Sequence, residues 1–182
     1  DNVASDIMSQ ETNESSSPWD RWSKLSNEIA KLFGWNLPML ECRWPGRSPG
    51  YGSLWFEVDT KICAAHNKEG FIAELNSINR PCVIVIGITE KADIEDTLSP
   101  LSKTYDHNFE FNQIIFTEPL SGRNKAVSAN KLKKIICGDK SSSGIVIKNP
   151  IDAIEEASII AKREGIDLIL MGSIYLVGDI LN

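Results

Sequence analysis

Residues 81–87 (PCVIVIG) form a continuous apolar run that is rich in β-branched residues. A strand with one face in water alternates apolar and polar residues, so an unbroken run predicts a strand buried on both faces. Strands of this kind occur almost only in parallel sheets that helices cover on either side. Residues 166–171 (IDLILM) form a second such run, interrupted by Asp167. The chain is therefore predicted to fold around a mainly parallel sheet.

Helix and strand patterns alternate along the rest of the chain. Helices are predicted over 18–33, 68–78, 150–164 and 174–181 and directly after the caps Asp93 and Ser128. Further strands are predicted over 113–116 and 144–148, and over 54–58 and 61–65 as a hairpin with a turn at Asp59-Thr60. This alternation indicates βαβ units with right-handed crossovers. The fold class is an α/β, three-layer Rossmann-like domain with helices on both faces of the sheet.

The apolar spacing within two of these helices predicts which side chains are buried. Phe71, Ile72, Leu75 and Ile78 are expected on the core face of the helix over 68–78. In the helix that starts at Asn149-Pro150, the expected core residues are Ile151, Ile154 and Ala161. Asn67 and Asn149 are expected to cap these two helices.

Composition limits the kinds of partner and compartment. The 182 residues carry a formal net charge of −6, which argues against nucleic acid or an anionic membrane as the main partner. The four cysteines show no CxxC pair or zinc spacing, so free thiols in a reducing compartment are expected, either the cytoplasm or an organelle matrix after removal of a transit segment. The expected organisation is a disordered or linker tail over 1–17, a helix and Pro/Gly-rich loop over 18–52, and the α/β domain over 53–182. Because the chain begins with Asp1, we expect a fragment or a processed product.

Polar residues directly follow four of the predicted strands, at His66-Asn67, Thr89–Lys91, Thr117-Glu118 and Gly172-Ser173. The carboxyl ends of parallel strands meet at one edge of a sheet, where ligands of open α/β folds bind. Lys91, Arg123, His66 and Ser173 at this edge would suit an anion, either a phosphate or the carboxylates of a small acidic substrate. For His66 taken alone, an exposed loop histidine is an equal alternative.

Several well-known sites have no counterpart in the sequence. GxxxxGK[ST], GxGxxG, HExxH and GxSxG are all absent, which argues against a phosphate-binding P-loop, a dinucleotide fold, a catalytic zinc and a hydrolase nucleophile in this chain. No metal ligands are predicted. Arg47 follows Pro45-Gly46 in a stiff loop and suits a phosphate or carboxylate, although a surface arginine in a turn fits the spacing at least as well.

Five segments of the chain resemble sequence motifs of one protein family, and they follow one another in the same order as in that family. Trp44–Arg47 (WPGR) resembles its WPGR loop, and Ala65–Asn67 resembles the end of its DGAHN motif. Residues 87–101 (GITEKADIEDTLSPL), Thr117 to Arg123, and 167–181 (DLILMGSIYLVGDIL) are similar to further motifs, the last being the most specific. The family is folylpolyglutamate synthase and dihydrofolate synthase of the Mur ligase superfamily, and the resemblance covers about residues 30–182 of this chain, matching the C-terminal domain.

This resemblance implies part of an ATP-dependent carboxylate–amine ligase that adds glutamate to folate or dihydropteroate through an acyl phosphate. ATP with Mg²⁺ would be shared with a P-loop ATPase domain, in cis or in trans, and the present chain would be inactive alone. Arg47, His66 and Asn67 would face the nucleotide, with His66 as the catalytic candidate. The incoming glutamate would be held by Lys91, Arg123 and Ser173.

The sequence also departs from the family's motifs. Cys63 and Ala64 replace the aspartate and glycine of DGAHN, Ala92 is inserted after Lys91, and Gly122 stands where the family usually has proline. A neutral thiol cannot make the charge-assisted hydrogen bonds of a carboxylate. An alternative function is therefore a non-catalytic binding or scaffold subunit that keeps the ligase fold.

Overall fold

The computed structural model describes residues 18–35, 57–106, 111–138 and 144–181. The chain divides into two compact units, Asp1–Arg43 and Trp44–Asn182. In the first unit, helix α2 spans Pro18–Leu32, and Gly34 adopts a positive φ of 66°, as predicted for a glycine just beyond a helix end. No helix in the described parts of the chain is long and apolar enough to cross a membrane.

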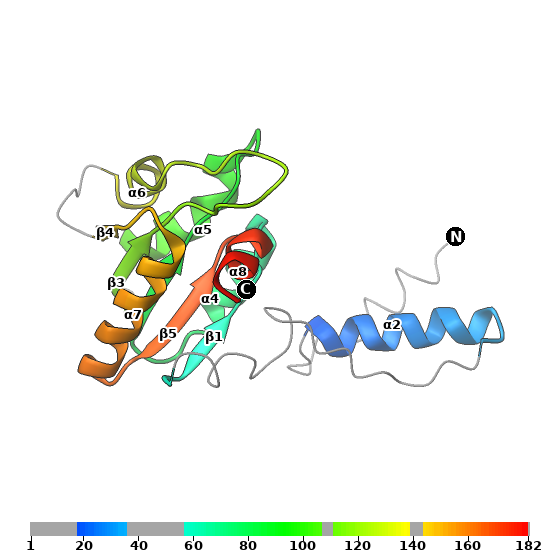
Figure 1. Cartoon of the computed structure of the whole chain (residues 1–182). Helices are drawn as coiled ribbons and strands as arrows, with labels where there is room; N and C mark the ends of the chain where they lie inside the picture. The colour runs from blue at the N-terminus through cyan, green and yellow to red at the C-terminus, as the bar shows by residue number, and fades with distance from the viewer. Residues whose placement is uncertain (1–17, 36–56, 107–110, 139–143, 182) are drawn as a thin grey trace. The chain divides into compact units, whose positions relative to one another are not determined.

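The second unit is built on a five-stranded sheet in the order β1-β5-β2-β3-β4 (Figure 1). Its strands are β1 Thr60–Ile62, β2 Cys82–Ile86, β3 Phe111–Phe116, β4 Ile145–Val146 and β5 Asp167–Met171. All of the strand pairings are parallel, so the strands share one carboxyl edge. Strand β2 lies at the centre, and all five of its residues are buried. The α/β fold predicted from the apolar runs is confirmed.

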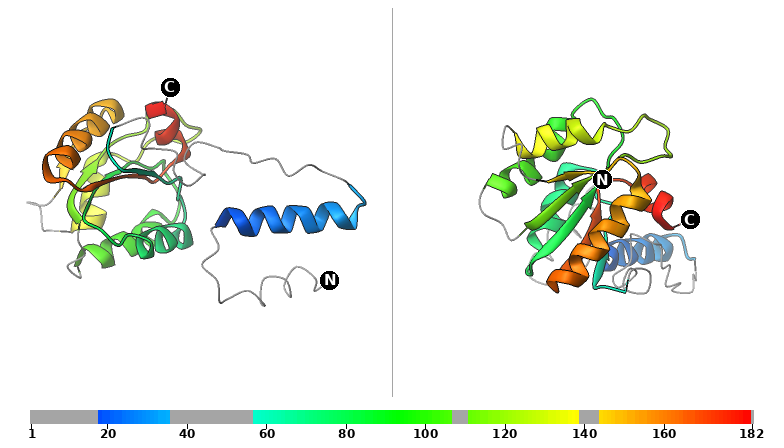
Figure 2. Two further views of the ribbon diagram at one scale, coloured as in Figure 1. Left: turned by 90° about the horizontal axis from the view of Figure 1, so that it is seen from below. Right: turned by 60° about the vertical axis from the view of Figure 1, so that its left-hand side comes forward.

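Helices cover both faces of this sheet (Figures 1 and 2). Helices α4 Lys68–Asn76, α5 Ile94–Asp106 and α6 Ala129–Cys137 pack on one face, and α7 Pro150–Glu164 and α8 Ile174–Leu181 pack on the other. Successive residues of a strand point to opposite faces. Accordingly, Ile84 and Ile86 of β2 join the core under α4–α6, whereas Val83 and Val85 join the core under α7 and α8.

Local capping fixes where the helices begin and end. The Asn67 side chain accepts from Gly70 N–H at 2.9 Å, and the Asn149 side chain accepts from Ile151 N–H at 2.8 Å. Ser128 caps α6 through Lys131 N–H at 3.3 Å. Gly165 ends α7 with a left-handed backbone (φ 65°). These four positions are the ones predicted from the sequence.

Three predictions about the elements were wrong. The predicted turn at Asp59-Thr60 is absent, because Thr60 begins β1 and pairs in parallel with Leu168 of β5. Residues 54–56, the first part of the predicted hairpin, lie outside the described residues. Strand β4 covers only Ile145–Val146 of the predicted 144–148.

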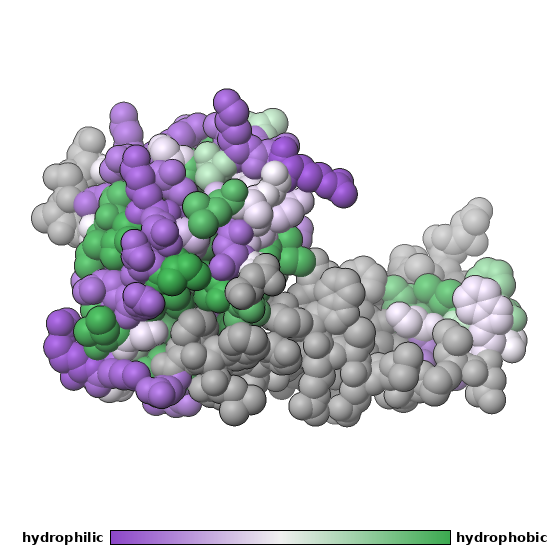
Figure 3. All heavy atoms as spheres, viewed as in Figure 1, coloured by the Kyte–Doolittle hydropathy of each residue, from purple (hydrophilic) through white to green (hydrophobic). Residues whose placement is uncertain are grey.

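The third error concerns two residues that were predicted to face the core. Ile72 and Ile151 are instead 43% and 39% exposed. Ile72 lies next to the buried Phe71, about 100° around the helix, and so falls outside the stripe that meets the sheet. Ile151 is in the first turn of α7, ahead of the buried Ile154. Ile159 and Ile174 are exposed as well. Figure 3 shows hydrophobic surface interspersed with hydrophilic surface on this unit.

Two glycines allow the ends of β2 and β5 to approach closely. Gly172 is buried with a φ of 117°, and a Cβ atom there would lie 2.4 Å from the carbonyl oxygen of Gly87. Only glycine adopts this backbone geometry without strain. The contact sets the positions of the turns that follow both strands.

We therefore expect Gly172→Ala to destabilise the protein by about 2 kcal/mol or more, through backbone strain together with the clash. Urea unfolding monitored by circular dichroism would measure this change. Gly178→Ala is the matched control, since Gly178 is inside α8 and a Cβ there meets nothing within 4 Å. Alanine at 178 should be neutral or stabilising by about 0.5–1 kcal/mol. Equal effects of the two substitutions would contradict the close-contact argument.

Candidate functional site

The turn between β1 and α4 presents His66 at the carboxyl edge of the sheet. The Cys63 N–H continues the pairing with β5 by donating to Leu170 O at 2.8 Å, after which the chain leaves the sheet. His66 is exposed, and its Nδ1 lies 2.9 Å from the Ala64 carbonyl oxygen. Because a carbonyl only accepts, Nδ1 carries the hydrogen in this bond, and Nε2 is the ring nitrogen that a ligand could contact. The Asn67 carboxamide oxygen is used by the cap, which leaves its NH₂ group for other contacts.

The turn after β2 meets the His66 turn directly. The Lys91 ammonium group donates a hydrogen bond to the His66 carbonyl oxygen. Residues 25 positions apart are thereby joined across the ends of two strands. The predicted gathering of these two turns at one edge is observed.

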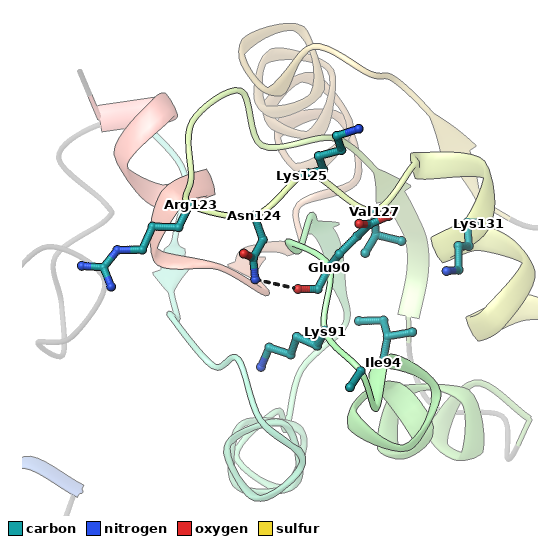
Figure 4. A pocket seen from close by; sticks show the side chains of 9 residues that line it. Glu90, Lys91, Ile94, Arg123, Asn124, Lys125, Val127 and Lys131 are labelled. Atoms are coloured by element: carbon teal, nitrogen blue, oxygen red, sulfur yellow. Dashed lines mark hydrogen bonds between the residues drawn. The ribbon is translucent and has the colours of Figure 1, made fainter.

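The segment after β3 folds back along the turn after β2. Thr89 and Ala126 form an antiparallel bridge, and Glu90 N–H donates to Lys125 O at 2.8 Å. The Asn124 side chain donates to Glu90 O at 3.1 Å (Figure 4). These bonds bring the 123–127 segment, with Arg123 and Lys125, beside Lys91.

Helix α8 holds the chain just before the 123–127 segment. Both Leu120 N–H and Ser121 N–H donate to Asp179 Oδ2, at 2.7 and 3.3 Å. The next residue, Gly122, has a φ of 141°, which a proline ring cannot adopt because it fixes φ near −65°. The glycine in place of the family's proline is therefore required by the backbone path of this loop.

The segments after β2 and β3, together with α6, line an open pocket of about 600 Å³ at the carboxyl edge (Figure 4). The segment after β2 provides its lining residues Glu90, Lys91, Ala92 and Ile94, and the segment after β3 and helix α6 provide Arg123, Asn124, Lys125, Val127 and Lys131. The lining thus combines four cations with one carboxylate, Glu90, which makes it suitable for an anion. In Figure 4 the Arg123 side chain extends away from Glu90 and Lys131.

Several polar residues at this edge serve the fold. The Ser173 hydroxyl is 4% exposed and accepts from Tyr175 N–H at 3.2 Å, so it caps α8. Thr117 is buried and donates to Lys148 O at 2.9 Å. Glu118 accepts from Ala129 N–H at 3.1 Å, at the start of α6. A ligand role for Ser173 stays a prediction, and Arg47 lies outside the described residues.

Sequence reasoning missed Lys125, Lys131 and Asp179. Lys125 comes eight residues after Thr117, in the returning segment, and Lys131 lies in the first turn of α6, so neither follows a strand directly. Asp179 acts through backbone amides that are 58 and 59 residues away in the chain. The sequence alone contains no periodic signal for such a contact.

Cys63, which replaces the family's aspartate, is a buried thiol. It is 4% exposed, and its sulfur accepts from Ala65 N–H at 3.2 Å. Burial and the neighbouring Glu74 carboxylate raise the pKa of the thiol to about 12, so it is uncharged at neutral pH. Glu74 is itself paired with Lys61 at 2.6 Å. No cluster of His, Cys, Asp and Glu within the described ranges could hold a metal ion.

The described residues thus form an open parallel α/β sheet with a cation-lined pocket at its carboxyl edge. Solved structures share this fold. The folylpolyglutamate synthase of Mycobacterium tuberculosis, complexed with ADP and AMPPCP, aligns with a TM-score of 0.60 and 19% identity over 83% of this chain. The Thermotoga maritima folylpolyglutamate synthase aligns with a TM-score of 0.56 and 23% identity over 87%. The bifunctional folylpolyglutamate synthase/dihydrofolate synthase of Yersinia pestis, complexed with AMPPNP and Mn, gives 0.52 and 20% over 84%.

These likenesses show that the chain has the fold of a part of the folylpolyglutamate synthases. The aligned region is 36% of the length of each of these enzymes. No protein-family model and no curated protein matches the chain by sequence. The fold expected from the motif resemblance is thus confirmed.

The surroundings of Cys63 predict that a carboxylate is poorly tolerated at this position. We expect Cys63→Asp to be about 2 kcal/mol less stable than Cys63→Ser, because it buries a second negative charge beside Glu74. Adding Glu74→Gln should recover much of this loss, since Lys61 then becomes available to the new carboxylate. Chemical unfolding of the three variants and the wild type would measure the coupling. Equal stability of Cys63→Asp and Cys63→Ser would contradict this interpretation.

Proposed function

We propose that this chain is the glutamate- and nucleotide-side domain of an ATP-dependent carboxylate–amine ligase, which adds glutamate to folate or dihydropteroate. The observation that carries the proposal is that Lys91 and Arg123, from turns after different strands, line the same cation-rich pocket, where Lys91 is also bonded to the His66 carbonyl. The shared fold with the folylpolyglutamate synthases supports it. The domain would act with a P-loop ATPase domain, in cis or in trans, in the cytoplasm.

Glutamate fits the charges of this pocket. Its two carboxylates would pair with Lys91 and Arg123, and the excess of cations from Lys125 and Lys131 would stabilise the dianion. Lys91 is held in place by its bond to the His66 carbonyl, so a contact with the substrate would require little additional ordering. Glu90 would attract the ammonium group and thereby orient the nucleophilic nitrogen.

The residues near His66 fit a nucleotide on the adjoining side of the edge. Among the described residues, His66 Nε2 and the Asn67 NH₂ group have no partner, and Arg47 would add a planar fork for phosphate oxygens. Bound ATP with Mg²⁺ supplies the phosphoryl group that activates a carboxylate. As the catalytic candidate, His66 would take a proton at Nε2 from the incoming ammonium group. The metal would be held by the phosphates and the ATPase domain.

A non-catalytic scaffold is the second candidate function. The buried, uncharged Cys63 favours it, because this turn then offers no carboxylate to a nucleotide at that position. Reconstitution with a folylpolyglutamate synthase ATPase domain separates the two functions. Glutamate-dependent ADP release would support the ligase, whereas a stable complex without turnover would support the scaffold.

Substitution of the two pocket cations tests the ligase proposal. We expect Lys91→Gln and Arg123→Gln each to weaken glutamate binding by roughly 10- to 100-fold, since a charge-assisted hydrogen bond contributes about 1.5–3 kcal/mol. Arg47→Ala should weaken Mg–ADP binding while leaving glutamate binding unchanged. Isothermal titration calorimetry on the 182-residue chain measures both ligands.

The matched control is Lys162→Gln, which removes one cation from α7 on the opposite face of the sheet, where Lys162 pairs with Glu57. This control should bind both ligands as the wild type does. Equal losses in the control and the pocket variants would show a general charge effect, and an absence of glutamate binding to the wild type would refute the assigned glutamate pocket.

A further inference from the structure

The segment that carries Arg123 is an exposed part of the carboxyl edge. Residues 120–125 are all exposed, and the side chain of Leu120 is 70% exposed, so burial of apolar groups does not fix the backbone here. Exposed segments open locally at little cost in free energy unless other interactions hold them. The placement of Arg123 therefore depends on the hydrogen bonds that reach this segment from neighbouring elements.

Asp179 of α8 holds the segment on the side that precedes Arg123. Its Oδ2 atom accepts from Leu120 N–H at 2.7 Å and from Ser121 N–H at 3.3 Å. Among the described residues, these are the only hydrogen bonds that reach residues 120–123. One carboxylate thus fixes the backbone that leads into Arg123.

Helix α8 is itself held firmly enough to act as a support. Its residues Leu176 and Val177 are buried in the core that α8 shares with α7. Tyr175 lies one turn before Asp179 and therefore on the same face of the helix. A Cβ atom at Gly122 would lie 3.3 Å from Tyr175 Cδ2, so this face of α8 contacts the segment closely.

A second contact holds the segment on the side that follows Arg123. The Asn124 side chain donates to Glu90 O at 3.1 Å, and Glu90 N–H donates to Lys125 O at 2.8 Å (Figure 4). Glu90 belongs to the turn after β2, which also carries Lys91. Arg123 is therefore placed relative to Lys91 by two supports, of which Asp179 is one.

We propose that Asp179 is a positioning residue for the cation-lined pocket, which acts by fixing the backbone before Arg123. The inference rests on the proposed function, in which Arg123 binds a carboxylate of glutamate. A binding segment that is already ordered loses less conformational entropy when its ligand arrives. Asp179 acts through the backbone of residues 120 and 121 and makes no contact with the ligand.

Removal of Asp179 should weaken glutamate binding only as long as Arg123 is present. We expect Asp179→Ala to weaken binding about three- to tenfold, which is the cost of ordering the segment on binding. In the Lys91→Gln background this effect should persist, whereas in the Arg123→Gln background it should fall below about twofold. Asp179→Asn should bind as the wild type does, because its carboxamide oxygen can accept both N–H groups. Titrations of the 182-residue chain with glutamate, followed by NMR, would measure these affinities.

Asn149→Ala is the matched control, because Asn149 also accepts from two backbone amides, those of Ile151 and Asp152, at the start of α7. It should lower the unfolding midpoint in urea and leave glutamate binding unchanged. A loss of binding in this control equal to that in Asp179→Ala would show a general effect of stability and would overturn the positioning role. The same role would be overturned by a full effect of Asp179→Ala in the Arg123→Gln background, or by equal losses in Asp179→Ala and Asp179→Asn.

Amide hydrogen exchange of the wild type gives a measurement that needs no substitution. The N–H groups of Leu120 and Ser121 should exchange more slowly than those of Gly122 and Arg123, and equal rates would overturn the positioning role. Glutamate binding by Asp179→Ala with the affinity of the wild type would overturn it while leaving the glutamate pocket intact. Wild-type protein that binds no glutamate would refute the pocket itself, and with it this role of Asp179.

Discussion

The site depends on a crowded point where three strand ends meet at Gly87. A Cβ atom at Gly87 would lie 3.0 Å from Thr117 O, and one at Gly172 would lie 2.4 Å from Gly87 O. The ends of β2 and β5 therefore meet through backbone atoms, and the end of β3 approaches Gly87 through the backbone and side chain of Thr117 and the ring of Pro119. The turns carrying Lys91, Arg123 and Ser173 all start from this contact, so its geometry sets how closely their functional groups approach.

Hydrogen bonding at this edge separates residues that hold the fold from residues available to a ligand. Thr117, Glu118, Ser173 and Asp179 direct their oxygens to backbone groups of neighbouring turns and helices. Once these bonds fix the backbone, the cations on the same segments need no partner inside the protein. Among the described residues these cations form no ion pairs, so they repel one another, and a dianion bound as proposed would relieve this repulsion. Binding at the pocket should therefore weaken as salt screens these charges.

The fold was predictable because its strongest signals are local or periodic. The continuous run at 81–87 identified β2, and Asn67, Ser128 and Asn149 marked three helix starts that the structure confirms. The exposure of Ile72 was not predictable from spacing, because it depends on how α4 rotates against the sheet. Likewise, Lys131 reaches the pocket only because the 117–128 segment returns along the turn after β2. Contacts that form when a loop folds back along an earlier turn depend on the tertiary structure.

The replacement at Cys63 is best understood together with Glu74. Although position 63 is neutral, the neighbourhood still carries one carboxylate, which lies on α4 and is paired with Lys61. Because Glu74 is paired with Lys61, its negative charge does not take the place of the charge that an aspartate at position 63 would bring to the turn. The retained Ala65–Asn67 turn keeps its cap and its link to Lys91 without the aspartate. Under the proposed function, glutamate binding at the cation pocket and nucleotide binding beside His66 would therefore be separable, and the neutral Cys63 would affect only the nucleotide side.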